Sequence, residues 1–121
     1  MVDSESEITL NGEIIFDSSP TQFSSATIDI QLRNIEKQDA SSEIKARKIL
    51  HDIKFKDVEN NRLAFSLNIS PSTLQFGFNV IWIHVDLDGD HKLSKDDFVT
   101  TGIYSVSENL DKLIKVTVKK I

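Results

Sequence analysis

The chain has 121 residues, of which 39% are hydrophobic and 27% are charged, and its formal net charge is −5. This length suits one compact domain with a modest core, and the acidic balance argues against a nucleic-acid partner, because such proteins present a basic face to phosphate. The sequence has no cysteine, which excludes disulfides, thiolate nucleophiles and zinc–thiolate sites. No apolar run reaches the roughly 18 residues of a transmembrane helix, so we expect no direct membrane insertion.

The first half of the chain is predicted to contain a tail and three strands. Residues 1–6 are polar, and we expect a disordered N-terminal tail before a single domain over residues 7–121. Apolar side chains alternate in residues 7–16 and, most clearly, in residues 26–35, which is typical of half-buried strands. Residues 43–55 fit either a strand or a short helix, and we favour a strand because the neighbouring segments are strands.

The second half is predicted to contribute four more strands, at residues 62–69, 79–85, 98–106 and 113–121. Residues 79–85 are almost continuously apolar, which indicates a central strand covered on both faces. Residues 113–121 alternate lysine with valine, which is typical of an edge strand protected against association. Seven short strands separated by turn sequences predict an all-β fold, namely an Ig-like antiparallel β-sandwich with an EF-hand-like loop between two late strands.

That loop is the stretch "DLDGDHKLSKDD" at residues 86–97, which holds five carboxylates in twelve residues. An EF-hand loop binds calcium through its first, third, fifth, seventh, ninth and twelfth positions. Here these positions are Asp86, Asp88, Asp90, Lys92 (through its backbone carbonyl), Ser94 (directly or through a water) and Asp97. The eighth position is apolar in such loops and is Leu93 here. The sequence therefore predicts that this loop binds a calcium ion.

Two positions depart from the EF-hand pattern. The sixth position is normally a glycine with positive φ and is His91 here, and the last is normally a bidentate glutamate and is the shorter Asp97. Asp96 is an alternative last ligand. Both departures predict weak affinity, on the order of 10⁻⁵–10⁻³ M, and leave magnesium or manganese open. Both flanks are strand-like, so we do not expect the opening of a helical calcium sensor.

The alternative interpretation of residues 86–97 is a solvated surface loop, since loops are rich in Asp, Gly, Ser and Lys. Twelve residues is long for a hairpin connection, where about two to five are usual. The five aspartates and two lysines of this loop sum to −3, and such a loop repels itself unless a cation joins its carboxylates.

Other residues carry weaker signals. His84 lies two residues before Asp86 and is either a neighbour of the metal site or an ordinary half-buried strand residue. Trp82 is either a core residue, which we favour, or a surface for stacking a ligand. Gly12 marks a bulge or a point of close packing in the first strand. No histidine stands in a catalytic pattern with serine and aspartate, so we expect no enzymatic activity.

The order of segments resembles a family of small bacterial β-sandwich domains that includes the YbaY-type lipoproteins and the type III secretion lipoprotein chaperones, or pilotins. The resembling segments are "NGEIIF", "SSATIDIQLRNIEKQDASSEIKARKIL", "RLAFSLNI" and "NVIWIHVDLDGDHKLSKDDFVTTGIYSV". They cover most of residues 7–106. The resemblance implies a non-enzymatic fold with a possible protein partner. Exported members begin with a signal and a lipidated cysteine, and this chain has neither.

Three functions follow from these patterns. The leading hypothesis is a non-enzymatic calcium-binding β-sandwich whose ion orders residues 86–97. The alternatives are a metal-independent partner-binding module of the pilotin or lipoprotein-chaperone type, which takes up a strand at a sheet edge, and a calcium-dependent carbohydrate or adhesion module. A weak calcium site favours the periplasm or the extracellular space if an export signal has been removed, and otherwise the polar start "MVDSESE" indicates the cytoplasm.

Overall fold

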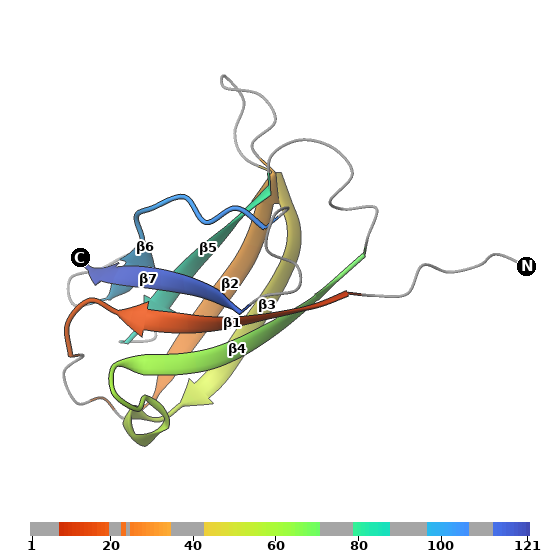
Figure 1. Cartoon of the computed structure of the whole chain (residues 1–121). Coiled ribbons are helices and arrows are strands. Elements are labelled where there is room, and N and C mark those ends of the chain that lie inside the picture. Colours follow the sequence, from red (N-terminus) through yellow and green to blue (C-terminus); the bar gives the residue numbers. More distant parts are fainter. Residues whose placement is uncertain are drawn as a thin grey trace, which may run out of the picture.

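The computed structural model describes residues 8–19, 23, 25–34, 43–70, 79–87, 97–106 and 113–121. The elements in these ranges are β1 (Ile8–Phe16), β2 (Ala26–Asn34), β3 (Glu43–Ile53), the 3₁₀ helix η1 (Phe55–Asp57), β4 (Arg62–Ile69), β5 (Asn79–Asp86), β6 (Phe98–Thr100) and β7 (Ile114–Lys120) (Figure 1). The predicted all-β class is confirmed, and the ambiguous segment 43–55 forms a strand as far as Ile53. The predicted tail, residues 1–6, lies outside the described residues.

The predicted division into two packed antiparallel sheets is wrong. All seven strands belong to one sheet in the order β3-β2-β5-β6-β7-β1-β4, and this sheet curls into a nearly closed barrel (Figure 1). β1 and β7 pair in parallel, whereas every other ladder is antiparallel. Alternation in a sequence identifies the buried face of a strand but not its neighbours, and twisted strands can bury that face by coiling one sheet on itself.

The two strands at the ends of the sheet are β3 and β4. Their Cα atoms approach within 8 Å of each other, but no ladder joins them in the described part of the chain. β7, which the sequence predicts to be an edge, lies instead between β6 and β1. Its alternating lysines point outward, with Lys115 and Lys119 exposed and Val116 and Val118 buried. The pattern thus indicates a wet outer face and does not reveal the strand's place in the sheet.

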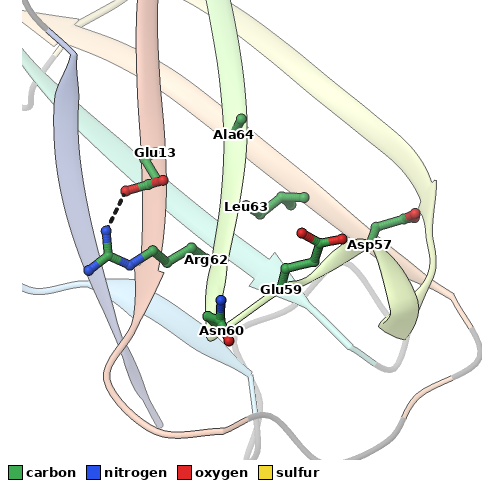
Figure 2. A pocket seen from close by; sticks show the side chains of 7 residues that line it. All are labelled: Glu13, Asp57, Glu59, Asn60, Arg62, Leu63 and Ala64. Atoms are coloured by element: carbon green, nitrogen blue, oxygen red, sulfur yellow. Dashed lines mark hydrogen bonds and ion pairs between the residues drawn. The ribbon is translucent and has the colours of Figure 1, made fainter.

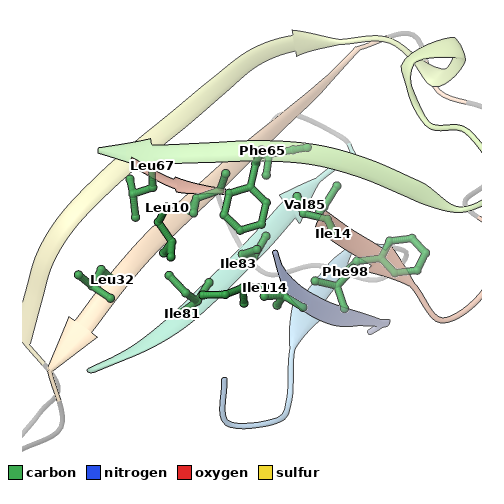
Figure 3. Packing of buried hydrophobic residues seen from close by; sticks show 14 of the residues in the cluster. Leu10, Ile14, Leu32, Phe65, Leu67, Ile81, Ile83, Val85, Phe98 and Ile114 are labelled. Atoms are coloured by element: carbon green, nitrogen blue, oxygen red, sulfur yellow. The ribbon is translucent and has the colours of Figure 1, made fainter. Parts of the chain in front are cut away.

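The core fills the inside of this curled sheet. Figure 3 shows side chains from β1, β2, β4, β5, β6 and β7 meeting there. Ile28, Ile30 and Leu32 of β2 are fully buried, as the alternation predicts. The rings of Phe16 and Phe98 meet edge to face, with centroids 5.0 Å apart. This core holds β5 and β6 in place, and these two strands carry the two ends of the acidic loop.

Candidate functional site

The acidic loop leaves β5 at Asp86 and enters β6 after Asp97, and both of these carboxylates are buried, with 3% and 0% of the residue exposed. The backbone N–H of Leu87 donates to Oδ1 of Asp97 over 3.0 Å. The backbone N–H of Ile121 donates to the carbonyl oxygen of Asp97 over 2.8 Å. Through these two hydrogen bonds, Asp97 holds Leu87, at the start of the loop, and Ile121 close to the end of the loop. We call Asp86, Leu87 and Asp97 the loop base.

His84, which the sequence places near the site, contacts the loop base. It is 7% exposed, and its Nε2 lies 3.0 Å from Oδ2 of Asp97. A carboxylate accepts hydrogen bonds, so this contact requires the His84 tautomer whose Nε2–H donates a hydrogen bond to Oδ2 of Asp97. Both oxygens of Asp97 therefore accept a hydrogen bond from the protein. The parity of residues 84 and 86 predicts that His84 and Asp86 share a face of β5, but no sequence signal pairs His84 with Asp97.

The other predicted calcium ligands are Asp88, Asp90, Lys92 and Ser94, and they lie outside the described residues, as do the anchor Leu93 and the alternative ligand Asp96. Within the described ranges, no group of three or more His, Cys, Asp or Glu residues is arranged to hold a metal ion. Of the predicted ligands, the described residues include Asp86 and Asp97, at the two ends of the loop. The complete ligand set stays a prediction.

A polar network covers the outer face of β2, β3 and β5 beside the loop base. Arg47 of β3 forms a two-pronged ion pair with Asp29 of β2, over 2.9 and 2.8 Å, and the hydrogen bond and negative charge of Asp29 raise the pKa of Arg47. Arg33 lies 4.2 Å from the centre of the Trp82 ring, and burial lowers the pKa of Arg33. The sequence favours Trp82 as a core residue, but in the structure it lies half-buried on this outer face. Arg33 covers one face of its ring, so that face is not open for stacking a sugar.

A small pocket of about 110 Å³ opens between this network and the loop base. Its lining residues are Thr27, Asp29, Arg47, Ile49, His51, His84 and Asp86. The ladder explains this gathering, because Thr27 lies opposite Asp86 and Asp29 lies opposite His84 across β2 and β5. The pocket is lined by both acidic and basic side chains, and the charges of Asp29 and Arg47 neutralise each other there.

A larger, acidic pocket of about 780 Å³ lies at the opposite edge of the sheet, beside the turn that leads into β4. Figure 2 shows its lining, which is Glu13, Asp57, Glu59, Asn60, Arg62, Leu63 and Ala64. The Asn60–Asn61 pair makes the tight turn, with φ values of 53° and 61°, in the left-handed region that asparagine tolerates. Arg62 and Glu13 form an ion pair of 3.0 Å across this pocket.

The open side of the barrel forms a third concavity, of about 380 Å³, between the two edge strands. We call it the β3–β4 groove. It is lined by Asn11 of β1, Lys48 and Leu50 of β3, and Ala64, Phe65 and Ser66 of β4. The apolar Leu50 and Phe65 line it next to the charge of Lys48. The sequence gives no direct sign of this groove, because it depends on which two strands end the sheet.

Comparisons with known proteins give a likeness in fold. No family model matches the sequence, and no curated protein matches it. Among solved structures, an alternative pilotin from the type II secretion system of Vibrio cholerae superposes with a TM-score of 0.70 at 12% sequence identity. The match covers 96% of this chain and 98% of that one. No helix in the described ranges is long and apolar enough to cross a membrane. The resemblance to pilotins noted in the sequence is therefore supported at the level of the fold, and the chain has a pilotin-like fold.

Proposed function

We propose that the protein is a non-enzymatic partner-binding module of the pilotin type, which binds a protein of a bacterial secretion system at the β3–β4 groove. The observation that carries this proposal is the likeness to a secretion-system pilotin over almost the full length of both chains. A likeness confined to a few strands would be shared by many β folds. We also propose that the protein acts in the periplasm, where such a partner would be met.

The β3–β4 groove is the part of the fold best suited to a protein partner. In a nearly closed barrel the backbone N–H and C=O groups of the strands are paired in ladders, except along the outer sides of the two strands that end the sheet. Here these strands face each other across a groove that offers apolar contact from Leu50 and Phe65 and a positive charge from Lys48. Protein interfaces commonly combine apolar and polar side chains in this way.

Site-specific photo-cross-linking in the source organism tests this function. A benzoylphenylalanine at Ser66, which lines the groove, is expected to give an adduct with one protein, identified by mass spectrometry as a component of a secretion system. The matched control places the same residue at Lys115, which is exposed on β7. Adducts of the same kind and amount at both positions, or none at Ser66, would contradict the proposal.

We further propose that residues 86–97 bind a calcium ion through Asp86, Asp88, Asp90, Lys92, Ser94 and Asp97. The buried carboxylates of Asp86 and Asp97 at the two ends of the loop support this second function. A cation there would reduce the repulsion between them.

The test is a measurement of unfolding free energy in calcium, in magnesium and in chelator. Calcium at about a hundredfold excess over its Kd is expected to stabilise the protein by about 2.7 kcal/mol, from mass action. Asp86→Ala and Asp90→Ala should abolish this gain, whereas the exposed Asp17→Ala should retain it. An equal gain in all three variants would refute the ligand assignment.

A further inference from the structure

On the basis of the proposed function, we propose how the partner binds: it adds a strand to the free edge of β3, along Ala46–Leu50, and the added segment is acidic. The partner is thus an extended segment of another protein that carries Asp or Glu opposite Lys48.

The backbone of β3 offers an unusually long free edge. β3 has eleven residues and, among the residues that the structure describes, forms a ladder with β2 alone. An edge strand presents unpaired N–H and C=O groups, which are a template for another strand. Natural edges are commonly shortened or interrupted by bulges, and β3 has register irregularities near both ends. Between them the pairing runs without a break from Ala46, opposite Leu32, to Leu50, opposite Ile28. These five residues span about 17 Å, which is enough for a short added strand.

The side chains of this stretch suit a segment of alternating character. Lys48 and Leu50 line the β3–β4 groove together with Phe65. Arg47 and Ile49 line the outer pocket, and Ile49 is 37% exposed. A strand added at this edge therefore has one face toward an apolar groove with a lysine and the other toward the outer surface. An apolar and an acidic residue on the first face, next to Leu50 and Lys48, and polar residues on the second face would meet this pattern.

The charge of β3 selects acidic segments. The stretch Ala46–Leu50 contains two basic residues and no acidic one, and Lys45 lies directly before it, in a chain whose formal net charge is −5. Arg47 is paired with Asp29, whereas Lys48 is exposed and forms no ion pair with a described residue. Opposite charges across paired strands stabilise a ladder and like charges destabilise it. Lysine on an edge also protects against unwanted pairing, and a segment of opposite charge lessens this protection.

The same charge argues against a second copy of this chain as the occupant. Antiparallel pairing of the whole stretch with itself is centred on Lys48, so the two lysines would lie directly opposite each other. Arg47 of each copy would then face Ile49 of the other, so no favourable charge pair would offset this repulsion.

The test uses dodecapeptides selected from a random phage-displayed library on the immobilised full chain. Selected peptides are expected to be enriched in Asp and Glu. Binding should weaken at least tenfold for the Lys45→Glu/Lys48→Glu variant and less than twofold for Lys115→Glu/Lys119→Glu, which makes the same change of charge on exposed lysines of β7. Amide hydrogen exchange of the peptide complex gives the second measurement. Within Ala46–Leu50, the amides not already bonded to β2 should exchange at least tenfold more slowly.

The outcomes separate the two proposals. Peptides that perturb the β3–β4 groove without slowing amide exchange in β3, or that show no acidic preference, would overturn strand addition and leave the proposed function standing. Selected peptides that bind only elsewhere, or an absence of selectable peptides together with no adduct at Ser66, would overturn both. A dimer in sedimentation whose β3 amides are protected would show that the occupant is a second copy, against the inference.

Discussion

Replacing Asp97 by alanine is expected to destabilise the protein by about 2–5 kcal/mol. The change removes the acceptor of two hydrogen bonds, one from the N–H of Leu87 and one from Nε2 of His84, both of 3.0 Å. A buried donor left without a partner costs about 1–3 kcal/mol. Leu87 is part-buried and contributes at the low end of this range, whereas the His84 side chain is 9% exposed and contributes nearer the high end. Since small domains are stable by about 5–15 kcal/mol, the effect is large.

The assay is urea denaturation followed by the fluorescence of the only tryptophan, Trp82, whose ring centroid lies 6.1 Å from that of His84. With a slope of about 2 kcal/mol per molar urea, a loss of 3 kcal/mol moves the midpoint by about 1.5 M. Excess chelator is present throughout, so the measurement reports the hydrogen bonds of Asp97 and not a bound ion.

Two further variants separate the contributions. Asp97→Asn retains an acceptor for Leu87 but places an NH₂ donor near His84, which must then change its tautomer, so the expected loss is smaller, about 1–2 kcal/mol. In a double-mutant cycle with His84→Ala, the coupling energy should be at least about 1 kcal/mol. A loss below about 0.5 kcal/mol in Asp97→Ala, equal to that of an ordinary surface change, would refute the role of Asp97 in closing the loop.

Three other changes test the fold around the site. In Gly12→Ala the new Cβ would collide with the ring of Phe65 and lie 3.0 Å from the carbonyl oxygen of Ile114. We therefore expect the unfolding free energy, measured by urea denaturation, to fall by about 1–3 kcal/mol and Phe65→Leu to restore part of it. Additive losses in the double variant would contradict this reasoning. Hydrogen bonds from Lys54 and Ser25 lower the pKa of Asp52 from its usual value of 3.8. The stability that these bonds contribute is therefore present above pH 3.8 and is lost as the pH falls through the lower pKa of the folded state. A pKa of 3.8 or higher for Asp52 in an NMR titration would contradict this assignment. Asn61→Ala should lose about 1 kcal/mol at its positive φ and Asn61→Gly almost none, as chemical denaturation would show.

Local patterns in the sequence predict the strands well, because burial of one face repeats every second residue. The alternation in residues 26–35 identifies Ile28, Ile30 and Leu32 as core, and all three are fully buried. The same parity places Lys115 outside and Val116 inside. Predicted segment 98–106 is less successful. β6 ends at Thr100, and residues 101–106 rejoin the sheet at the bridge between Ser105 and Val80.

The sequence likewise predicts only part of the candidate site. Spacing within twelve residues suffices to nominate Asp86 and Asp97 as parts of one loop site, because the loop's own chain links them. It does not reveal that His84 donates to Asp97, since that contact depends on how β5 pairs with β6. It also misplaces Trp82, because an apolar run does not show which face of a central strand the core covers.

By itself the sequence determined the all-β class, the position of the strands, the parity of their buried faces and the concentration of charge in residues 86–97. Only the tertiary structure decided that the seven strands form one curled sheet, that β1 pairs in parallel with β7, and that β3 and β4 are the two end strands of the sheet in the described part of the chain. The physical reason is that burial of a face is a local property of a strand, whereas the choice of neighbours is a global one. The free edge of β3, on which the proposed binding rests, is a consequence of that global choice.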